Sequence, residues 1–278
     1  MSAPVAVEAD GAVHTIRLAR PERGNALGPD MVAAIDAALD AVLAAGARLV
    51  VLRGEGRHFC TGFDLSDLDA LSEGDLALRV IRIELLLQRI HALPVTTLVL
   101  AGGRVFGAGA DLFAACDHRV ALAGASFAFP GPAFGLVLGT ARLAALGGDG
   151  PARRLLLAGG AIEAGAALAM GLATQVVEPD GAAGAIGVAR DAAVRLDAAT
   201  VAALHGRTRR ADDAADLAAL ARSVARPGLK ERILAYRAQV AASRPRALSG
   251  TGGSPPGPRS VRPQRRPAGR AGASRDPC

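Results

Sequence analysis

The order of strand-like and helix-like segments is the strongest constraint on the fold of this chain. Alternating apolar and polar residues predict strands over 5–8 and 13–18, which the turn sequence Ala-Asp-Gly joins. Apolar residues at helical spacing predict helices over 29–45 and 76–93, and each helix precedes a short buried strand. Because strands and helices then alternate, the chain is predicted to form an α/β fold with crossover connections.

The second half of the chain continues this pattern and then becomes helical. A short helix is predicted over 112–116, and strands are predicted at "HRVALA", "SFAF" and "TQVVE", with helices near 141–147, 151–158 and 163–170 between the last two. Two or three amphipathic helices are expected within residues 185–243. We therefore divide the chain into an α/β core, a helical C-terminal region and a tail, over residues 1–184, 185–247 and 248–278.

The tail accounts for most of the chain's positive charge. The net charge of the 278 residues is +6, of which +5 lies in residues 248–278, leaving +1 on the remainder. A nearly neutral body has no basic face, so we predict no nucleic-acid binding. The tail contains six Pro and six Gly with few aliphatic side chains, and it is predicted to be disordered.

Cysteine content and hydropathy bear on the compartment. The three cysteines are scattered and form no Cys-x-x-Cys motif, which argues against a disulfide framework or a zinc site. The N-terminus lacks a basic segment followed by an apolar one, and no uncharged run is long enough to span a membrane. A cytoplasmic protein with no membrane partner is therefore expected.

Two glycine-containing loops, at 56–68 and 101–117, follow predicted strands. The second loop, "AGGRVFGAGADLFAACD", places the lone acid Asp111 directly after tiny residues, near the start of a helix. Its "GAGA" lacks the third glycine of a dinucleotide-binding turn, since Leu112 stands there. Unpaired amides at a helix start can hold a developing negative charge, whereas an acid there can also simply cap the helix. Taken alone, each loop also fits an ordinary connection.

Together the two loops resemble the enoyl-CoA hydratase/isomerase family, also called the crotonase superfamily. The resemblance rests on "VVLRGEGRHFCTGFDLSDL" and, about forty residues later, "LVLAGGRVFGAGADLFAACDHRVALAGASFAF". It extends to "RPERGNAL" and to "AIEAGAALAMGLATQVVEP", and covers about residues 5–240. The fold it implies is a crotonase-like ββα superhelix core with a C-terminal helical region.

The resemblance also implies a substrate and a site. The substrate is an acyl-CoA thioester, whose carbonyl oxygen is held by two backbone amides, here those of Phe63 and Ala108. Asp111 matches the position of one catalytic acid. Segment 23–27 is expected near the pantetheine and adenine, and residues 64–66 near the nucleotide end of CoA. The residues expected at the substrate are Arg23, Asn25, Ala26, Leu27, Thr61, Gly62, Asp64, Leu65, Ser66, Gly107 and Gly131.

The chain departs from the family pattern at the second acid. Hydratases of this family typically use two glutamates, but the first is shortened here to Asp111 and Gly131 stands at the position of the second. One carboxylate can shuttle a proton in an isomerisation or serve twice in sequence. The chain is therefore predicted to be an enoyl-CoA hydratase/isomerase-type enzyme that uses Asp111 alone. The alternative is a degenerate member that binds acyl-CoA or a partner subunit without turnover.

The remaining expectations concern partners and other reactive side chains. The resemblance implies a homotrimer or a hexamer and no metal or redox cofactor, because CoA belongs to the substrate. His58, His91 and His118 are candidates for an additional base, with a structural place the more ordinary explanation. Cys60 and Cys116 are interpreted as core residues.

Overall fold

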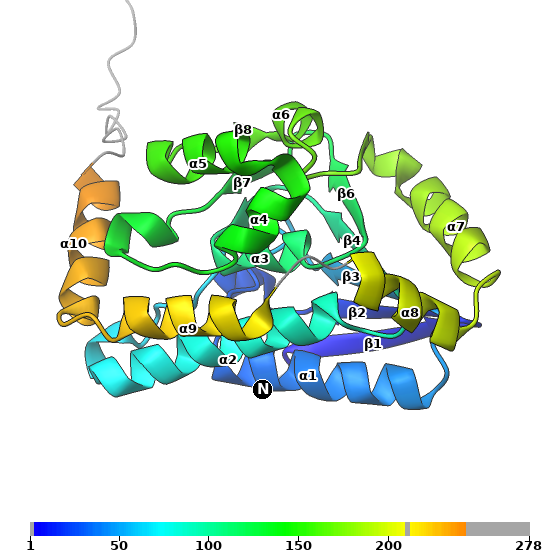
Figure 1. Ribbon diagram of the computed structural model, residues 1–278, viewed down its shortest axis with the longest axis horizontal. Helices are drawn as coiled ribbons and strands as arrows, with labels where there is room; N and C mark the ends of the chain where they lie inside the picture. Colours follow the sequence, from blue (N-terminus) through cyan, green and yellow to red (C-terminus); the bar gives the residue numbers. More distant parts are fainter. Residues whose placement is uncertain (1–2, 209–211, 243–278) are drawn as a thin grey trace, which may run out of the picture.

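The computed structural model describes residues 3–208 and 212–242 (Figure 1). The predicted tail, 248–278, lies outside the described residues. Within them, strands and helices alternate up to β9 and the chain is helical thereafter, as the sequence predicts. None of the described helices is both long and apolar enough to cross a membrane.

The central sheet has six strands in the order β1-β2-β3-β4-β6-β9. The first two strands form an antiparallel hairpin that pairs Val5 with Leu18, and every later neighbour is parallel. Parallel neighbours require crossover connections, which the intervening helices supply. The strands are β1 (Val5–Asp10), β2 (Val13–Leu18), β3 (Leu49–Gly54), β4 (Thr96–Ala101), β6 (His118–Leu122) and β9 (Gln175–Val177).

Both faces of this sheet are covered, which explains why its inner strands are almost continuously apolar. One face packs on α1 (Pro29–Ala44) and α2 (Glu73–His91), whose buried side chains include Ile35 and Leu87. The other face packs on α7 (Ala182–Ala193) through three alanines one helical turn apart. The predicted boundary between residues 184 and 185 falls inside this helix.

A second, three-stranded sheet contains part of the second predicted loop. Its order is β5-β7-β8, from Arg104–Phe106, Ser126–Ala128 and Ile162–Glu163. An isolated bridge joins Cys60 to Val105 and another joins Leu27 to Phe63, so both predicted loops meet at the edge of this sheet. The short helix α3 (Ala108–Ala114) begins where β5 ends.

Helix α3 begins earlier than the sequence predicts. The expected start at residue 112 is wrong, because Gly107 turns the chain into the helix with φ 52° and the helix begins at Ala108. All seven residues of α3 are buried. A helix surrounded on every side has no polar face, so the periodic signal on which the prediction rests is absent. Strands β5 and β8 were also missed because they have only three and two residues.

The helices of the C-terminal part pack on different sides of the core (Figure 1). Of these helices, α9 packs along α2, and α10 contacts both α2 and η3. Of residues 185–243, where two or three helices were expected, the described ones belong to four, α7 to α10. Besides β8, β9 and α7, the described elements after β7 are η3 (Gly131–Phe134), α4 (Thr140–Gly147), α5 (Asp149–Ala158), α6 (Ala164–Ala169), η4 (Pro179–Gly181), α8 (Ala198–Thr208), α9 (Asp213–Val224) and α10 (Leu229–Ala242).

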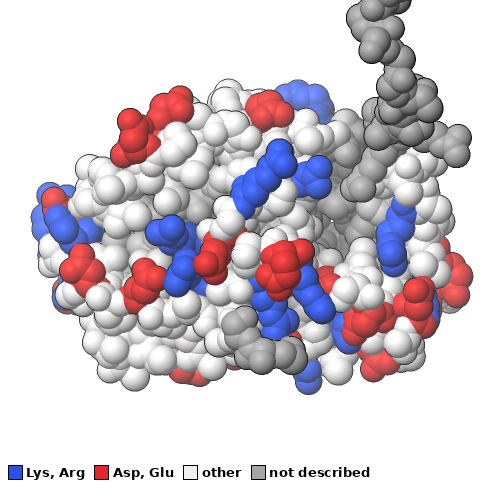
Figure 2. Space-filling model, turned by 180° about the vertical axis from the view of Figure 1, so that it is seen from behind, with Lys and Arg blue, Asp and Glu red and all other residues white. Residues whose placement is uncertain are grey.

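The surface of the described residues carries mixed charge. Figure 2 shows acidic and basic side chains interspersed over the face that it presents. Exposed pairs such as Arg17–Glu8 and Arg79–Asp67 bring opposite charges together. Such a surface gives a polyanion no continuous basic patch on the face in view.

A half-buried polar contact ties α8 to the core. His205 donates from Nε2 to Asp117 Oδ1 at 3.2 Å and from Nδ1 to the carbonyl of Leu93 at 2.7 Å. Asp117 Oδ2 accepts hydrogen bonds from the amide and hydroxyl of Thr97, both at 2.8 Å. The bond to Asp117 raises the pKa of His205. Burial opposes ionisation of Asp117, but the bonds from His205 and Thr97 still lower its pKa.

We predict that His205→Gln destabilises the protein by about 1–2 kcal/mol, with the largest effect between about pH 4 and 6.5. Because the pKa of His205 is raised in the folded protein, the stability that His205 contributes is complete below about pH 6.5 and is lost as the pH rises through its folded-state pKa. Because the pKa of Asp117 is lowered, the stability that Asp117 contributes is lost as the pH falls through its own folded-state pKa. Urea unfolding across pH measures the difference, with His118→Gln as a control. A deficit that does not vary with pH contradicts this account.

Candidate active site

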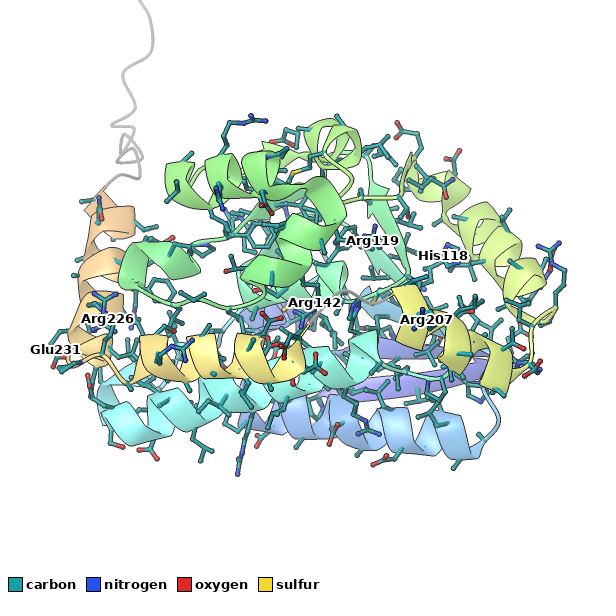
Figure 3. All side chains as sticks on the ribbon, viewed as in Figure 1. His118, Arg119, Arg142, Arg207, Arg226 and Glu231 are labelled. Carbon is teal, nitrogen blue, oxygen red and sulfur yellow. The ribbon has the colours of Figure 1, made fainter. Side chains whose placement is uncertain are left out.

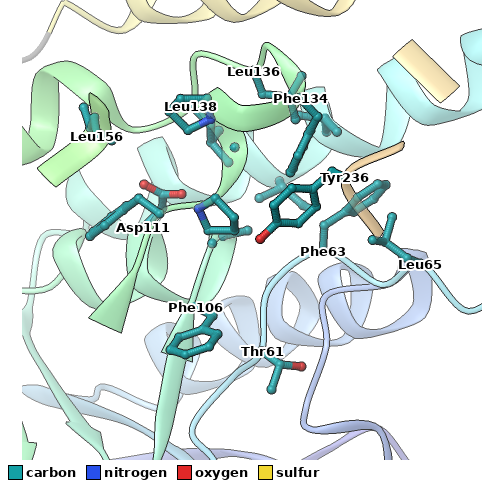
Figure 4. Close-up of a pocket in the computed structure, with 18 residues that line it drawn as sticks. Thr61, Phe63, Leu65, Phe106, Asp111, Phe134, Leu136, Leu138, Leu156 and Tyr236 are labelled. Atoms are coloured by element: carbon teal, nitrogen blue, oxygen red, sulfur yellow. The ribbon is translucent and has the colours of Figure 1, made fainter. Parts of the chain in front are cut away.

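A cavity of about 200 Å³ lies between α2, α3, the η3 loop and α10 (Figure 4). Its wall is mostly apolar, and its polar side chains are Thr61, Asp111 and Tyr236. Apolar enclosure with a few polar groups is the usual character of a small-molecule site. The lining residues are Thr61, Phe63, Leu65, Val80, Ile83, Phe106, Gly107, Ala108, Asp111, Phe129, Pro130, Gly131, Pro132, Phe134, Leu136, Leu138, Leu156 and Tyr236.

Two glycines let the predicted loops touch at this cavity. A Cβ on Gly62 would lie 2.7 Å from the carbonyl oxygen of Phe106 and 3.4 Å from the amide nitrogen of Ala108. A Cβ on Gly109 would lie 2.5 Å from the carbonyl oxygen of Cys60. Neither distance to oxygen leaves room for a side chain, so glycine is required at both positions. The backbone at 60–63 therefore lies directly against the start of α3.

The amides of Phe63 and Ala108 lie on these two touching segments. Around Phe63, Leu27 donates to the carbonyl of Gly62 and Asp64 donates to the carbonyl of Leu27, at 2.7 and 3.3 Å. Neither the Phe63 nor the Ala108 amide donates a hydrogen bond to any atom of the described residues. Ala108 is the first residue of α3, where helix geometry leaves an amide without an intrahelical acceptor. Both residues line the cavity, and neither amide has an acceptor among the described residues.

The Asp111 side chain lines the same cavity and is only 4% exposed. No hydrogen-bond donor among the described residues contacts its carboxylate. Gly139, at the start of α4, has a φ of 61° and lies so close that a Cβ there would be 2.0 Å from Asp111 Oδ1. The backbone of the loop before α4 therefore confines the carboxylate, and a larger residue at position 139 would displace it.

A buried ion pair lies near Asp111. Arg142, on α4, donates from Nη2 to Glu84 Oε1 at 3.1 Å, and Gln88 donates to the same oxygen at 2.9 Å. Arg142 and Glu84 are 2% and 1% exposed, and Figure 3 shows Arg142 in the interior beside α2 and α4. Arg142 Nε and Nη1 and Glu84 Oε2 have no hydrogen-bond partner in the described part of the chain. The pair thus places a positive and a negative charge inside the protein near the cavity.

Burial dominates the protonation of these acids. Removal from water raises the pKa of Asp111 well above its ordinary value, although the charge of Arg142 opposes the rise and that of Glu84 adds to it. Burial also raises the pKa of Glu84 against the opposing effects of Arg142 and Gln88. A carboxyl group with a raised pKa exchanges protons more readily near neutral pH than an ordinary one.

The structure brings together part of the predicted site. Seven of the residues predicted at the site line the cavity: Thr61, Phe63, Leu65, Gly107, Ala108, Asp111 and Gly131. The others do not line it: Arg23, Asn25, Ala26, Leu27, Gly62, Asp64 and Ser66.

Residues of the segment 23–27 have structural contacts instead. Asn25 is fully buried, accepts a hydrogen bond from the amide of Arg20 and donates to the carbonyls of Glu55 and His58. Leu27 is a core residue at 1% exposure. Arg23 and Asp64 form an ion pair of 3.9 Å next to this segment. A role for these residues toward CoA stays a prediction.

The position of the expected second acid, Gly131, lines the cavity and carries no side chain. None of the three candidate histidines lines the cavity. His58 accepts a hydrogen bond from the amide of Arg104 at 3.1 Å, and burial together with Arg104 and Arg57 lowers its pKa. His91 contacts the carbonyl of Ala115. Among the residues that line the cavity, Asp111 is therefore the one carboxyl group.

Both described cysteines are core residues, as expected. Cys60 and Cys116 are 0% and 2% exposed. Burial raises the pKa of the Cys60 thiol to about 12 and raises that of Cys116 as well. A thiol that stays protonated is a poor nucleophile, so neither cysteine is suited to covalent catalysis. The described residues contain no group of three or more side chains suited to hold a metal ion.

Sequence reasoning missed three residues in and around the cavity. Tyr236 comes from α10, more than a hundred residues from Asp111 along the chain. Glu84 interrupts the apolar face of a predicted helix, which is a signal that a buried partner exists but does not say which. Arg142 gave no signal, because arginine is frequent throughout the chain.

The fold and the comparisons with known proteins agree on a class. A structure from Bordetella parapertussis, provisionally named an enoyl-CoA hydratase/isomerase, is 46% identical with a TM-score of 0.83, over 86% of this chain and all of that chain. This similarity assigns the α/β core and its C-terminal helices to the crotonase fold. A family model described as enoyl-CoA hydratase/isomerase matches residues 8–181. The chain belongs to the enoyl-CoA hydratase/isomerase family.

Curated relatives give the same family. A probable enoyl-CoA hydratase of Mycobacterium bovis is 38% identical over 168 residues, which cover 59% of this chain and 67% of the relative. A short-chain-enoyl-CoA hydratase of Clostridium acetobutylicum is 30% identical over 186 residues, covering 63% of this chain and 69% of the relative. Each alignment covers between 59% and 69% of either protein rather than its whole length.

We predict that Arg142→Met destabilises the protein by about 3–5 kcal/mol, because it leaves the buried Glu84 without a counter-charge. The double variant Arg142→Met with Glu84→Gln should recover part of this loss, since it removes the uncompensated charge. Urea unfolding measures both. Arg153→Met provides a matched control, because Arg153 pairs with Asp149 at 4.0 Å on the surface and should change stability by less than about 1 kcal/mol. Equal losses at positions 142 and 153 contradict the assignment.

Proposed function

We propose that the protein is an acyl-CoA-processing enzyme of enoyl-CoA hydratase/isomerase type. In this proposal the amides of Phe63 and Ala108 hold the thioester oxygen, and Asp111 moves the proton. The observation that carries it is one cavity lined by two amides without acceptors and by a single buried carboxyl group. Family membership supports the substrate class, because the matching relatives are named enoyl-CoA hydratases.

The proposed chemistry starts at the thioester carbonyl. Two N–H donors aimed at its oxygen stabilise the negative charge that develops as an enolate forms, and they do so strongly where water is excluded. Phe63 and Ala108 need no particular side chain for this role, because the backbone provides both donors. Alanine at position 108 is compatible with this role, since α3 gives that residue a helical conformation.

Asp111 would act as base and then as acid. In an isomerisation its carboxylate takes a proton from one carbon next to the double-bond system, and the protonated form returns that proton to another carbon of the enolate. In a hydration it takes a proton from water as the oxygen adds to the β-carbon, and then protonates the α-carbon. Both sequences regenerate the carboxylate, so one acid suffices for either reaction. Gly131 cannot contribute a second acid, which favours reactions that need only one.

The proposal extends to the compartment, the oligomeric state and the cofactor requirement of the enzyme. We propose that it works in the cytoplasm as a homotrimer or hexamer, and that it needs no metal or redox cofactor because CoA arrives with the substrate. Arg23, Ala26, Asp64 and Ser66 would face the CoA portion outside the acyl cavity. The exposed side chains of Leu157 and Val188, at 85% and 74%, are compatible with burial between subunits.

We predict that Asp111→Asn lowers kcat/KM for the preferred enoyl-CoA ester by about 10²- to 10⁴-fold, because the amide can neither accept nor return the proton. In the native enzyme kcat/KM should rise with pH through the raised pKa of Asp111, since the ionised form is the base. Spectrophotometric assays with enoyl-, 3-hydroxyacyl- and malonyl-type CoA esters measure both effects. Unaltered turnover in Asp111→Asn contradicts the assigned role.

A second candidate function is acyl-CoA binding without turnover, which the absent second acid favours. Gly131→Glu separates the two candidates. A Cβ at position 131 meets Leu136 at an ordinary 3.6 Å, so the site tolerates a side chain there. We predict that Gly131→Glu raises the hydration rate by at least about tenfold, because a second carboxyl group then faces the cavity. Gly131→Gln is the control. Tight binding of CoA esters with no turnover in any variant supports the binding protein instead.

A further inference from the structure

The aromatic residues of this chain are concentrated at the cavity. The sequence contains seven Phe and one Tyr, and five of these eight side chains line this site. The five are Phe63, Phe106, Phe129, Phe134 and Tyr236. In a protein whose core is built mainly from Ala, Val, Leu and Ile, this enrichment lines the proposed acyl site with aromatic side chains.

Tyr236 adds a polar group to this wall. Figure 4 shows its ring beside Phe134 with the hydroxyl directed into the cavity, and the two ring centroids are 5.3 Å apart. The hydroxyl has no hydrogen-bond partner among the described residues, whereas Thr61 donates its hydroxyl to the carbonyl of Gly24. Tyrosine hydroxyls in partly buried places ordinarily find a partner. Burial also raises the pKa of Tyr236, so the hydroxyl stays protonated and can donate.

The helix that carries Tyr236 is held in place by contacts at its first half. Arg232 Nε donates to the carbonyl of Phe134 at 2.9 Å, and Lys230 Nζ donates to the carbonyls of Asp69 and Leu71 at 2.8 Å. Leu229 and Ile233 are fully buried in the cluster that also contains Phe134. The phenol is therefore presented by a fixed helix rather than by a loose segment.

The size of the cavity limits what can meet this hydroxyl. About 200 Å³ is smaller than the roughly 300–1,000 Å³ of sites that enclose drug-sized ligands. A compact acyl group fits this space better than a long alkyl chain. Flat rings pack favourably, offset or edge to face, against side chains such as Phe63 and Phe134.

We propose that the acyl group taken by this site is a compact aryl group with a polar substituent, and that the Tyr236 hydroxyl binds this substituent. This inference rests on the proposed function and specifies its substrate class. Tyr236 is then a specificity-determining residue, while Asp111 and the two amides serve the reacting atoms. A site that offers a hydroxyl to a ligand also discriminates against ligands that leave it unpaired.

Binding of saturated CoA esters tests the proposal without turnover. Isothermal titration calorimetry compares hexanoyl-CoA, 3-phenylpropanoyl-CoA and the 3-phenylpropanoyl-CoA esters hydroxylated at the meta or para position. The expected order is tightest binding for one hydroxylated ester, then the plain phenyl ester, then hexanoyl-CoA. In Tyr236→Phe, the advantage of the hydroxylated ester, about 2- to 10-fold, should vanish while the plain phenyl ester binds as before. Leu234→Ala on the exposed side of α10 is the control.

The outcomes distinguish the proposed role of Tyr236 and the aryl substrate class from the proposed acyl-CoA function. Equal binding of hydroxylated and plain phenyl esters by the native protein, or a preference that survives in Tyr236→Phe, overturns the assignment of Tyr236. Hexanoyl-CoA binding as tightly as the plain phenyl ester overturns the aryl class. If the folded protein binds none of the esters, the proposed function fails with it, whereas binding of hexanoyl-CoA alone leaves that function standing.

Discussion

The close contact between two backbone segments is the constraint on which the rest of the site depends. Gly62 and Gly109 have no side chains, and only for that reason can the chain at 60–63 lie against the start of α3. This contact places two amides without acceptors beside one cavity and sets Asp111 one helical turn further along. A methyl group at either glycine would separate the segments. Glycine at both positions is therefore needed for the packing of the segments and for the arrangement of the site.

Ionisable side chains buried at and near the cavity are the second feature on which the site depends. Asp111 has no hydrogen-bond donor of its own among the described residues, and the buried pair of Arg142 and Glu84 lies nearby. Buried carboxyl groups are costly for stability, because they lose the solvation that favours ionisation. The same loss of solvation raises the pKa of Asp111. Asp111 therefore combines a cost in stability with a carboxyl group that exchanges protons nearer neutral pH than an ordinary one.

The C-terminal helices complete a site that the α/β core only begins. Phe63, Ala108 and Asp111 come from the core, whereas Tyr236 comes from α10 and closes the opposite wall. Four of the five aromatic side chains at the cavity precede the C-terminal helices in the chain, and Tyr236 is the one that α10 adds.

The sequence by itself determined the strand and helix order, the two loops and the residue Asp111, because strong periodicity and short glycine motifs are local signals. The start of α3 and the short strands β5 and β8 escaped it, since a fully buried helix has no polar face and a strand of two or three residues has no period. Only the tertiary structure brought Tyr236 into the cavity wall and the Arg142–Glu84 pair near Asp111. Contacts between segments far apart in the chain depend on how helices pack, and no local pattern records that packing.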